Sequence, residues 1–264
     1  LKGKFALSNA SGRLRQGLVV FQFVVAIVLV CGMLVIERQI SYMKEKELGF
    51  NPERKILIPL RTTEAKEKYE PLKTSLEQMS SVHAVSGTVY PPGSRIFSDM
   101  AFYRGGGSMD NAVLHRRNRM DAGYMELLGI DLIAGRAFTT NRSAESKGQL
   151  IVNRASAEKY GVTPEKMVGE KLYFDWQGQK YTFEVIGVME DWNQTSLRDP
   201  IVPVAFEVPE SATDYSYVVA NVNPSGFTQT LASLEDLWKG HVSDAPFEYS
   251  FLDDTIQKQY SEDD

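Results

Sequence analysis

The stretch that decides the fold of this chain is an uncharged run of 21 residues, QGLVVFQFVVAIVLVCGMLVI, at positions 16–36. As a helix this run would be about 30 Å long, which matches the hydrocarbon core of a bilayer. Charged sequence bounds it on both sides, SGRLR before it and ERQISYMKEKE after it. We therefore interpret residues 16–36 as a transmembrane helix that anchors the rest of the chain.

Three other interpretations of the run are weaker. A buried core helix of a soluble protein usually carries a polar stripe, and this run has none. A cleaved signal peptide has a shorter apolar part and a small-residue cleavage site, whereas Glu37 and Arg38 follow here. A lipoprotein signal ending at Cys31 would need a small residue before the cysteine, but Val30 is there. Because Cys31 is the only cysteine, an intramolecular disulfide and a cysteine-based metal site are excluded.

The charges indicate which side of the membrane each part occupies. Residues 1–15 contain four of the 29 basic residues and no acid, so the positive-inside rule places them in the cytoplasm. The remaining 25 basic residues stand against all 34 acidic ones, which gives the part outside a net charge of −9. An acidic domain of this kind is a poor partner for nucleic acid, and it has no polybasic patch for anionic lipid.

The pattern after the span predicts an α+β fold. The helix is expected to continue as a stalk over residues 37–49, with Ile36, Ile40 and Met43 on one face and Gly49 as its C-cap. A β-α-β unit follows, with strands at 55–60 and 82–89 and a helix at 63–80. Near the end of the chain we expect strands at 203–208, 215–222 and 247–252 and a helix at 227–239.

These patterns predict two subdomains within an outer region of about 220 residues. The segments 50–94 and 201–252 can join in one split β-α-β sheet. Residues 95–200 would then be an inserted, mostly-β subdomain, and residues 253–264 begin a helix that leads to another span. Because the chain begins with Leu1 rather than Met, we expect it to be a piece of a larger protein.

The sequence contains no recognisable catalytic, metal or cofactor motif. His83, His115 and His241 are scattered and lack metal-ligand spacing. The three glycines at 105–107 favour a hairpin turn over a phosphate loop, since no Lys-Ser/Thr follows them. The acid pair at 190–191 is best explained as a solvated turn at a strand end. We therefore predict no catalytic residue, no metal site and no cofactor.

Several stretches, read together and in order, carry a family resemblance. They are LVVFQFVVAIVLV at 18–30 leading into ISYMKEKELGFN at 40–51, GYMELLGIDLIAGRAF at 123–138, IVNRASAEKYG at 151–161, MVGEKL at 167–172, FEVIGVMEDWNQTSLRDPIVP at 183–203, and FEYSFLDDTIQKQY at 247–260. The chain resembles the permease subunits of the MacB/FtsX/LolCE-like class of ABC transporters, especially those with a MacB-like periplasmic core domain.

The resemblance implies an architecture and a set of partners. Residues 50–94 and 201–252 would form a porter-like subdomain, and residues 95–200 a sabre-like one. The full-length protein would be a multi-pass protein of the inner membrane with its periplasmic part after about residue 37. It would form a homodimer, or a pseudo-dimer with another permease, in the lipid bilayer. A separate cytoplasmic ABC ATPase would drive it, so the permease itself would not be an enzyme.

Particular residues are candidates for roles in such a protein. The stalk face of Ile36, Ile40 and Met43 would transmit motion between protomers, with simple packing onto a neighbouring span as the alternative. Structural roles are predicted for Gly129, Gly135, Arg136, Gly169 and Gly187, and Arg136 is expected to pair with a nearby acid. Two competing functions stay open, the extracytoplasmic sensor of a membrane receptor and a membrane-tethered enzyme. The cargo is not identified.

Overall fold

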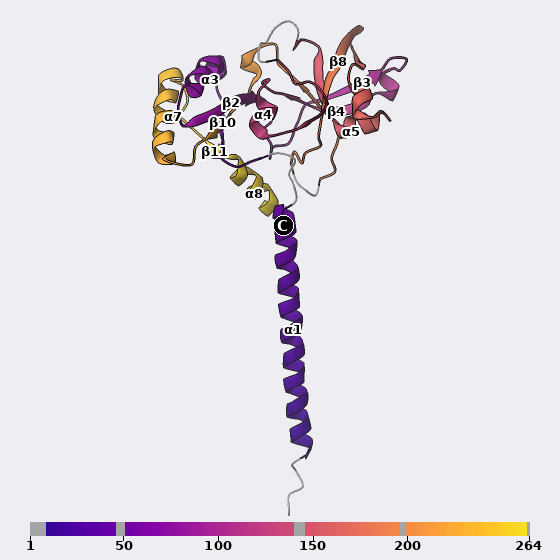
Figure 1. Cartoon of the computed structure of the whole chain (residues 1–264), viewed down its shortest axis with the longest axis vertical. Helices are drawn as coiled ribbons and strands as arrows, with labels where there is room; N and C mark the ends of the chain where they lie inside the picture. The colour runs from indigo at the N-terminus through magenta and orange to yellow at the C-terminus, as the bar shows by residue number, and fades with distance from the viewer. Residues whose placement is uncertain (1–8, 46–50, 140–145, 196–198, 263–264) are drawn as a thin grey trace, which may run out of the picture. The chain divides into compact units, whose positions relative to one another are not determined.

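The computed structural model describes the backbone of residues 9–45, 51–139, 146–195 and 199–262. It divides into two units, residues 1–47 and residues 48–264. The described part of the first unit is one helix, and the second unit is a mixed α/β domain (Figure 1).

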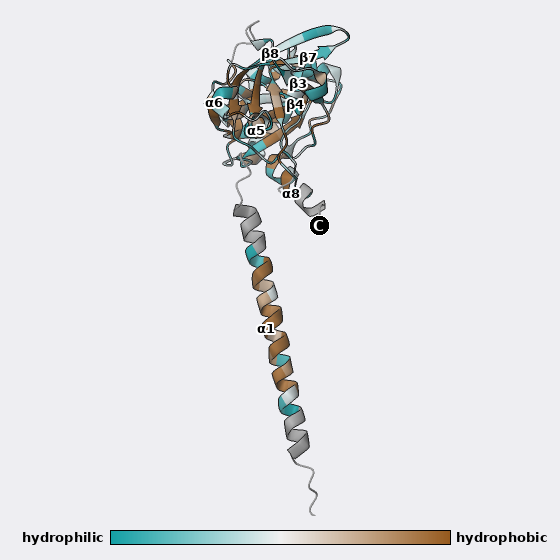
Figure 2. Cartoon of the chain, turned by 90° about the vertical axis from the view of Figure 1, so that its right-hand side faces the viewer, coloured by the Kyte–Doolittle hydropathy of each residue, from teal (hydrophilic) through white to brown (hydrophobic). Residues whose placement is uncertain are grey.

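The first unit is helix α1 (Asn9–Glu45), a continuous helix of 37 residues. Its part from Arg15 to Arg38 is long and apolar enough to cross a membrane, and none of that part is buried. Figure 2 shows the apolar band along this helix. This exposure argues against the interpretation of α1 as a buried core helix of a soluble protein. The expected C-cap at Gly49 lies outside the described residues.

A four-stranded sheet is formed by strands from the beginning and the end of the second unit. It contains β1 (Lys55–Pro59), β2 (Val82–Thr88), β10 (Tyr217–Val222) and β11 (Ser250–Phe251) in the order β11-β1-β10-β2. All neighbouring pairs are antiparallel, so β1 and β2 run in the same direction with β10 between them. In the same way β10 and β11 are parallel with β1 between them. Two interleaved split β-α-β units of this kind make a ferredoxin-like sheet.

The helices of the two split β-α-β units cover one face of the four-stranded sheet. They are α2 (Thr63–Glu67), α3 (Tyr69–Glu77) and α7 (Phe227–His241). The single helix expected at 63–80 is therefore divided at Lys68. Pro71 explains the new start, since its missing N–H needs no partner in the first turn of α3.

Alternate residues of β1 pack on opposite sides of this sheet. Ile56 and Ile58 join the cluster formed with α3 and α7, whereas Leu57 belongs to a second cluster on the other face. Because both faces are covered, the strand is a continuous apolar run rather than an alternating one.

A seven-stranded sheet occupies the middle of the domain. Its strands are β3 (Asp99–Arg104), β4 (Val113–Arg119), β5 (Leu132–Gly135), β6 (Gln149–Asn153), β7 (Lys171–Trp176), β8 (Gln179–Met189) and β9 (Val204–Glu207). The order is β5-β8-β6-β9-β4-β3-β7, and β7 also pairs with β8. These pairings close six strands into a ring, to which β5 is attached at the end of β8. We call this ring the β-ring.

Short helices complete the domain. They are α4 (Tyr124–Leu128), α5 (Arg154–Lys159), α6 (Pro164–Met167), α8 (Leu252–Glu262) and the 3-10 turns η1 (Met109–Asn111) and η3 (Ala212–Asp214). Side chains of α5 and α6, Ala157 and Met167, enter the interior of the β-ring beside Phe102 and Leu172.

Two sequence expectations require correction. We assigned residues 201–252 to the first sheet, but β9 pairs with β4 and β6 and so belongs to the β-ring. The strand alternates between Ala205 in the ring interior and Phe206 in the core between the sheets, a placement that depends on distant partners. The strand expected at 247–252 pairs only at Ser250–Phe251, because α8 begins at Leu252. The remaining domain boundaries stay predictions.

Candidate functional site

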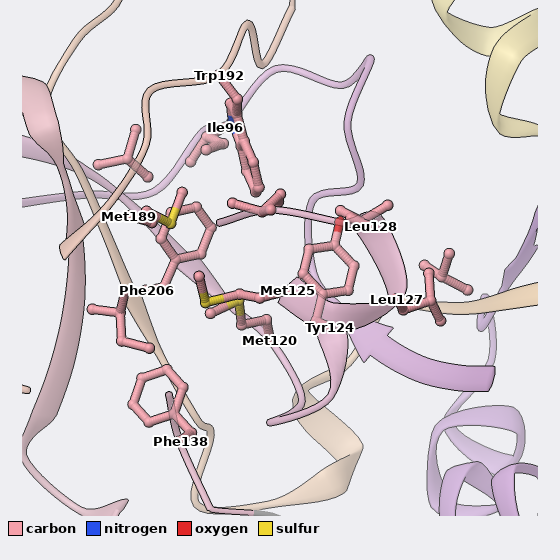
Figure 3. Close-up of a cluster of buried hydrophobic side chains, with 14 of the residues drawn as sticks. Ile96, Met120, Tyr124, Met125, Leu127, Leu128, Phe138, Met189, Trp192 and Phe206 are labelled. Atoms are coloured by element: carbon pink, nitrogen blue, oxygen red, sulfur yellow. The ribbon is translucent and has the colours of Figure 1, made fainter. Parts of the chain in front are cut away.

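The junction between the two sheets is filled by the buried cluster that joins them. Helix α4 contributes Tyr124, Leu127 and Leu128 to a buried cluster that fills this junction (Figure 3). Leu57 enters the cluster from the four-stranded sheet, and Phe206 enters it from the β-ring. The two sheets therefore share one core, with α4 between them.

The segments by which the chain enters and leaves the domain both reach this junction. At the entry, the backbone N–H of Asn51 donates to the carbonyl of Leu128, the last residue of α4, over 2.7 Å. At the exit, Leu252 and Ile256 of α8 pack into the same buried cluster. The two segments therefore contact α4 or the core that surrounds it.

Gly129 ends α4 and fixes this arrangement. It has a φ of +69°, in the left-handed region that glycine occupies without strain. Its N–H donates to Glu126 and the following N–H of Ile130 donates to Met125, so the last carbonyls of the helix are satisfied. The predicted structural role of Gly129 thus has a local physical reason.

A buried carboxylate ties α3 to the turn before α4. Asp121 accepts a hydrogen bond from the Tyr69 hydroxyl over 2.7 Å and an ion-paired one from Lys73 Nζ over 2.8 Å. Its own N–H donates to the carbonyl of Gly87 in β2 over 2.8 Å. Burying a charge is costly unless it is paired, and these partners supply hydrogen bonds and an opposite charge to the buried carboxyl group. Sequence reasoning missed this group, since its partners are about 50 residues away.

The structure brings together most of the predicted motif residues where β5 pairs antiparallel with β8. We call this place, where Gly135 and Gly187 face each other's strand, the glycine crossing. A Cβ added to Gly135 would lie 2.3 Å from the carbonyl oxygen of Ile186, and one added to Gly187 would lie 2.6 Å from that of Arg136. The Arg136 N–H donates to Ile186 over 2.9 Å at the same place. Only glycine permits so close an approach of two backbones.

Gly169 lies beside this crossing, with a φ of +84° and its N–H donating to Val185 over 2.7 Å. Arg136 Nη1 donates to the carbonyl of Ala137 over 3.3 Å. Within the described residues no carboxylate is seen beside this guanidinium, so its acid partner stays a prediction. Functional roles for these residues also stay predictions.

The acid pair at 190–191 is more than a solvated turn. Glu190 accepts two hydrogen bonds of 2.7 Å from the guanidinium of Arg154, and this pairing lowers the pKa of Glu190. Asp191 accepts from Asn153 Nδ2 over 2.8 Å and from the Ala155 N–H over 3.0 Å. Burial nevertheless raises the pKa of Asp191. The pair anchors the start of α5 to the end of β8.

The stalk candidates can be placed only in part. Ile36 lies in α1 with 58% of its surface exposed. The backbone at Ile40 and Met43 is helical, and their side chains lie outside the described part of the chain. Among the residues that the structure describes, no cluster of histidine, cysteine or acidic side chains could hold a metal ion.

Comparisons with known proteins identify the family of this chain. The family model described as MacB-like periplasmic core domain matches residues 24–236. No protein of curated function matches the chain significantly. The crystal structure of the periplasmic region of MacB from Actinobacillus actinomycetemcomitans is similar with a TM-score of 0.55 at 16% identity, covering 83% of this chain and 97% of that one.

A second similar structure is a domain of a putative permease protein from Porphyromonas gingivalis. It has a TM-score of 0.53 at 13% identity and covers 75% of this chain and 89% of that one. At these identities the similarity concerns the fold.

Proposed function

Since the chain belongs to the family of MacB-like periplasmic core domains, we propose that it is the extracytoplasmic part and one span of an ABC transporter permease subunit. In this proposal a separate cytoplasmic ATPase hydrolyses ATP, and the permease converts that hydrolysis into movement of its periplasmic domain. The protein would lie in the inner membrane and pair with a second permease. The four-stranded sheet would be its porter-like subdomain and the β-ring its sabre-like one.

The observation that carries this proposal is the position of the junction core. A permease that works by moving its periplasmic domain must pass displacement from its membrane helices into that domain. In this chain the entry segment at Asn51 and the exit helix α8 both contact α4 or its core. The same core includes residues of both sheets, so a displacement at either end would move the whole domain.

The stalk would supply the displacement. Helix α1 continues to Glu45, well beyond the apolar part that ends near Arg38. Residues 36, 40 and 43 fall within one narrow arc of this helix at about 100° per residue. Two such stalks, one from each permease, could close against each other along this arc when ATP binds. This mechanism would need no cofactor and no catalytic residue in the domain.

The test is to purify the full-length protein from membranes in a mild detergent and identify what accompanies it. We expect an ABC-type ATPase in a one-to-one ratio. The substitutions Ile40→Asp and Met43→Asp should change its rate of ATP hydrolysis, because each places a charge in the proposed contact. Ser41→Asp serves as the matched control, since residue 41 points away from that arc. Recovery of a signalling kinase without an ATPase would replace the permease by the sensor of a receptor.

A further inference from the structure

One end of the β-ring is filled and the other is open. At the filled end the segment after α5 covers the interior, where Tyr160 donates its hydroxyl to the carbonyl of Phe102 over 3.0 Å. The interior below contains Phe102, Leu172 and Val185. At the opposite end there is a cavity of about 620 Å³, which we call the ring mouth. Mouths of β-barrels are frequent sites of ligand binding, and this volume lies within the usual range.

On two strands of the ring, the side chains that point into the interior are followed, at alternate positions, by side chains that line the mouth. In β7, Leu172 is in the interior and Phe174 and Trp176 follow at alternate positions toward the mouth. In β8, Val185 is in the interior and Phe183 and Tyr181 lead outward in the same way. The period of two along each strand directs these aromatic side chains into the opening. The aromatic side of the mouth is therefore built by strands of the ring rather than by a surface loop.

One wall of the mouth is aromatic. Phe174 and Trp176 are stacked with ring centroids 6.1 Å apart and an angle of 15° between their planes. The ring centroids of Phe174 and Tyr181 are also only 6.2 Å apart. Trp176 keeps 57% of its surface exposed, which is uncommon for the largest apolar side chain. The wall thus presents flat aromatic faces to the opening.

The facing wall is charged but neutral as a whole. Arg117 and Arg119 of β4 both pair with Glu207 of β9, and Arg119 Nη1 lies 3.4 Å from Asp214 Oδ2. Lys147 pairs with Glu210 over 3.0 Å at the rim. Three basic and three acidic side chains therefore line the cavity. They offer many hydrogen-bond donors and acceptors without an excess of either charge.

This combination excludes several kinds of ligand. An anion would have to displace the carboxylates that already occupy both arginines. An acyl chain would need a deep apolar channel, but Phe102 and Leu172 fill the ring below the mouth. A peptide adding as a strand would need a long free edge, whereas every ring strand has a neighbour on each side and only the short stretch where β3 and β7 separate beyond Tyr103 and Tyr173 is unpaired.

We propose that the ring mouth binds an uncharged saccharide. A sugar ring has an apolar C–H face that can stack on Trp176 and Phe174, and hydroxyl groups around its edge. Those hydroxyls would donate to Glu207 and Asp214 and accept from Arg119. The site is independent of the proposed transport function, because it uses neither the stalk nor the junction core.

The test measures sugar binding by the complete chain in lauryldimethylamine oxide, a detergent without a sugar headgroup. Chitotriose and maltotriose are the probes. Trp192 and Trp238 are buried, so a saturable change in tryptophan fluorescence would report chiefly on Trp176. Saturation-transfer NMR measures the same binding in variants. We expect Trp176→Ala to weaken it about tenfold, the upper end for one aromatic stack.

Two further variants separate a binding role from a structural one. Asp214→Asn should weaken sugar binding several-fold, while Phe97→Ala, at an aromatic residue that is 75% exposed outside the mouth, should leave it unchanged. Circular dichroism checks that all three variants remain folded. The proposal is overturned if neither sugar binds at about 10 mM. It is equally overturned if Trp176→Ala binds both sugars as well as the parent chain does.

Discussion

The four-stranded sheet and the β-ring bury their apolar side chains by different means. The sheet relies on other elements, with α3 and α7 on one face and the junction core on the other. The ring pairs its own edges and encloses its own interior. The sheet should therefore depend on the junction for its stability, whereas the ring should tolerate damage there better. The changes below test that difference in order of expected effect.

The largest effect is expected from opening a cavity in the junction core. Phe206→Ala should lower the free energy of unfolding by about 3–5 kcal/mol, because a fully buried aromatic side chain is lost between the two sheets. Urea unfolding followed by far-UV circular dichroism and by tryptophan fluorescence measures it. Coincident transitions would show that the sheets unfold together. Two separated transitions would show instead that the ring survives without the junction.

The interior of the ring provides a test by pH. His115 is fully buried beside Phe102 and Tyr160, and burial lowers its pKa to about 4 from an ordinary 6.5. Because the unfolded chain binds this proton more readily, the stability should fall as the pH decreases from 6.5 to 4. The expected loss is about 3 kcal/mol, the difference in pKa at 1.36 kcal/mol per unit.

The matched variant is His115→Phe, which keeps an aromatic ring in the same packing. The part of the pH dependence due to His115 is the difference between the parent and this variant in urea unfolding at each pH. Identical curves for the two proteins would show that the imidazole is not held neutral by the ring interior.

A substitution at the glycine crossing tests whether the close approach of β5 to β8 is needed for stability. Gly135→Ala should destabilise the protein by about 2–3 kcal/mol, since it combines a positive φ with a backbone clash. Gly240→Ala is the control, because a Cβ there meets nothing within 4 Å and alanine favours helix α7. Thermal unfolding of the two variants compares them. Equal melting temperatures would contradict the crowding at the crossing.

The polar link to α3 should have the smallest effect of the four. Asp121→Asn removes the charge that Lys73 and Tyr69 contact and should cost about 1–3 kcal/mol. The double variant with Lys73→Met should regain part of that loss, since the half-buried ammonium group, whose other carboxylate partner Glu77 is 3.9 Å away, is also removed. A double-variant cycle by urea unfolding measures the coupling. A coupling of zero would mean that this link does not hold α3 to the junction.

Most of the local structure could be predicted from the sequence, because it follows from period and turn chemistry. The strands expected at 55–60 and 82–89 are observed at Lys55–Pro59 and Val82–Thr88, and the apolar run of α1 was recognised from its length and its lack of charge. Interactions between distant segments could not be predicted. The pairing of β9 with β4, and the contacts of Asp121 with Tyr69, depend on which segments the fold brings together. No local pattern around residues 121 or 204 carries that information.

The insertion of the β-ring between β2 and β10 determines the order in which the domain can fold. Strands β1 and β2 are made early, but β10 must lie between them before either is fully paired. During synthesis and export, this pair must therefore wait for the whole ring to emerge. The ring contains all of its own strands and can close before β10 arrives. The high sequence separation of the β2–β10 contact predicts that completing the four-stranded sheet is the slow step of folding.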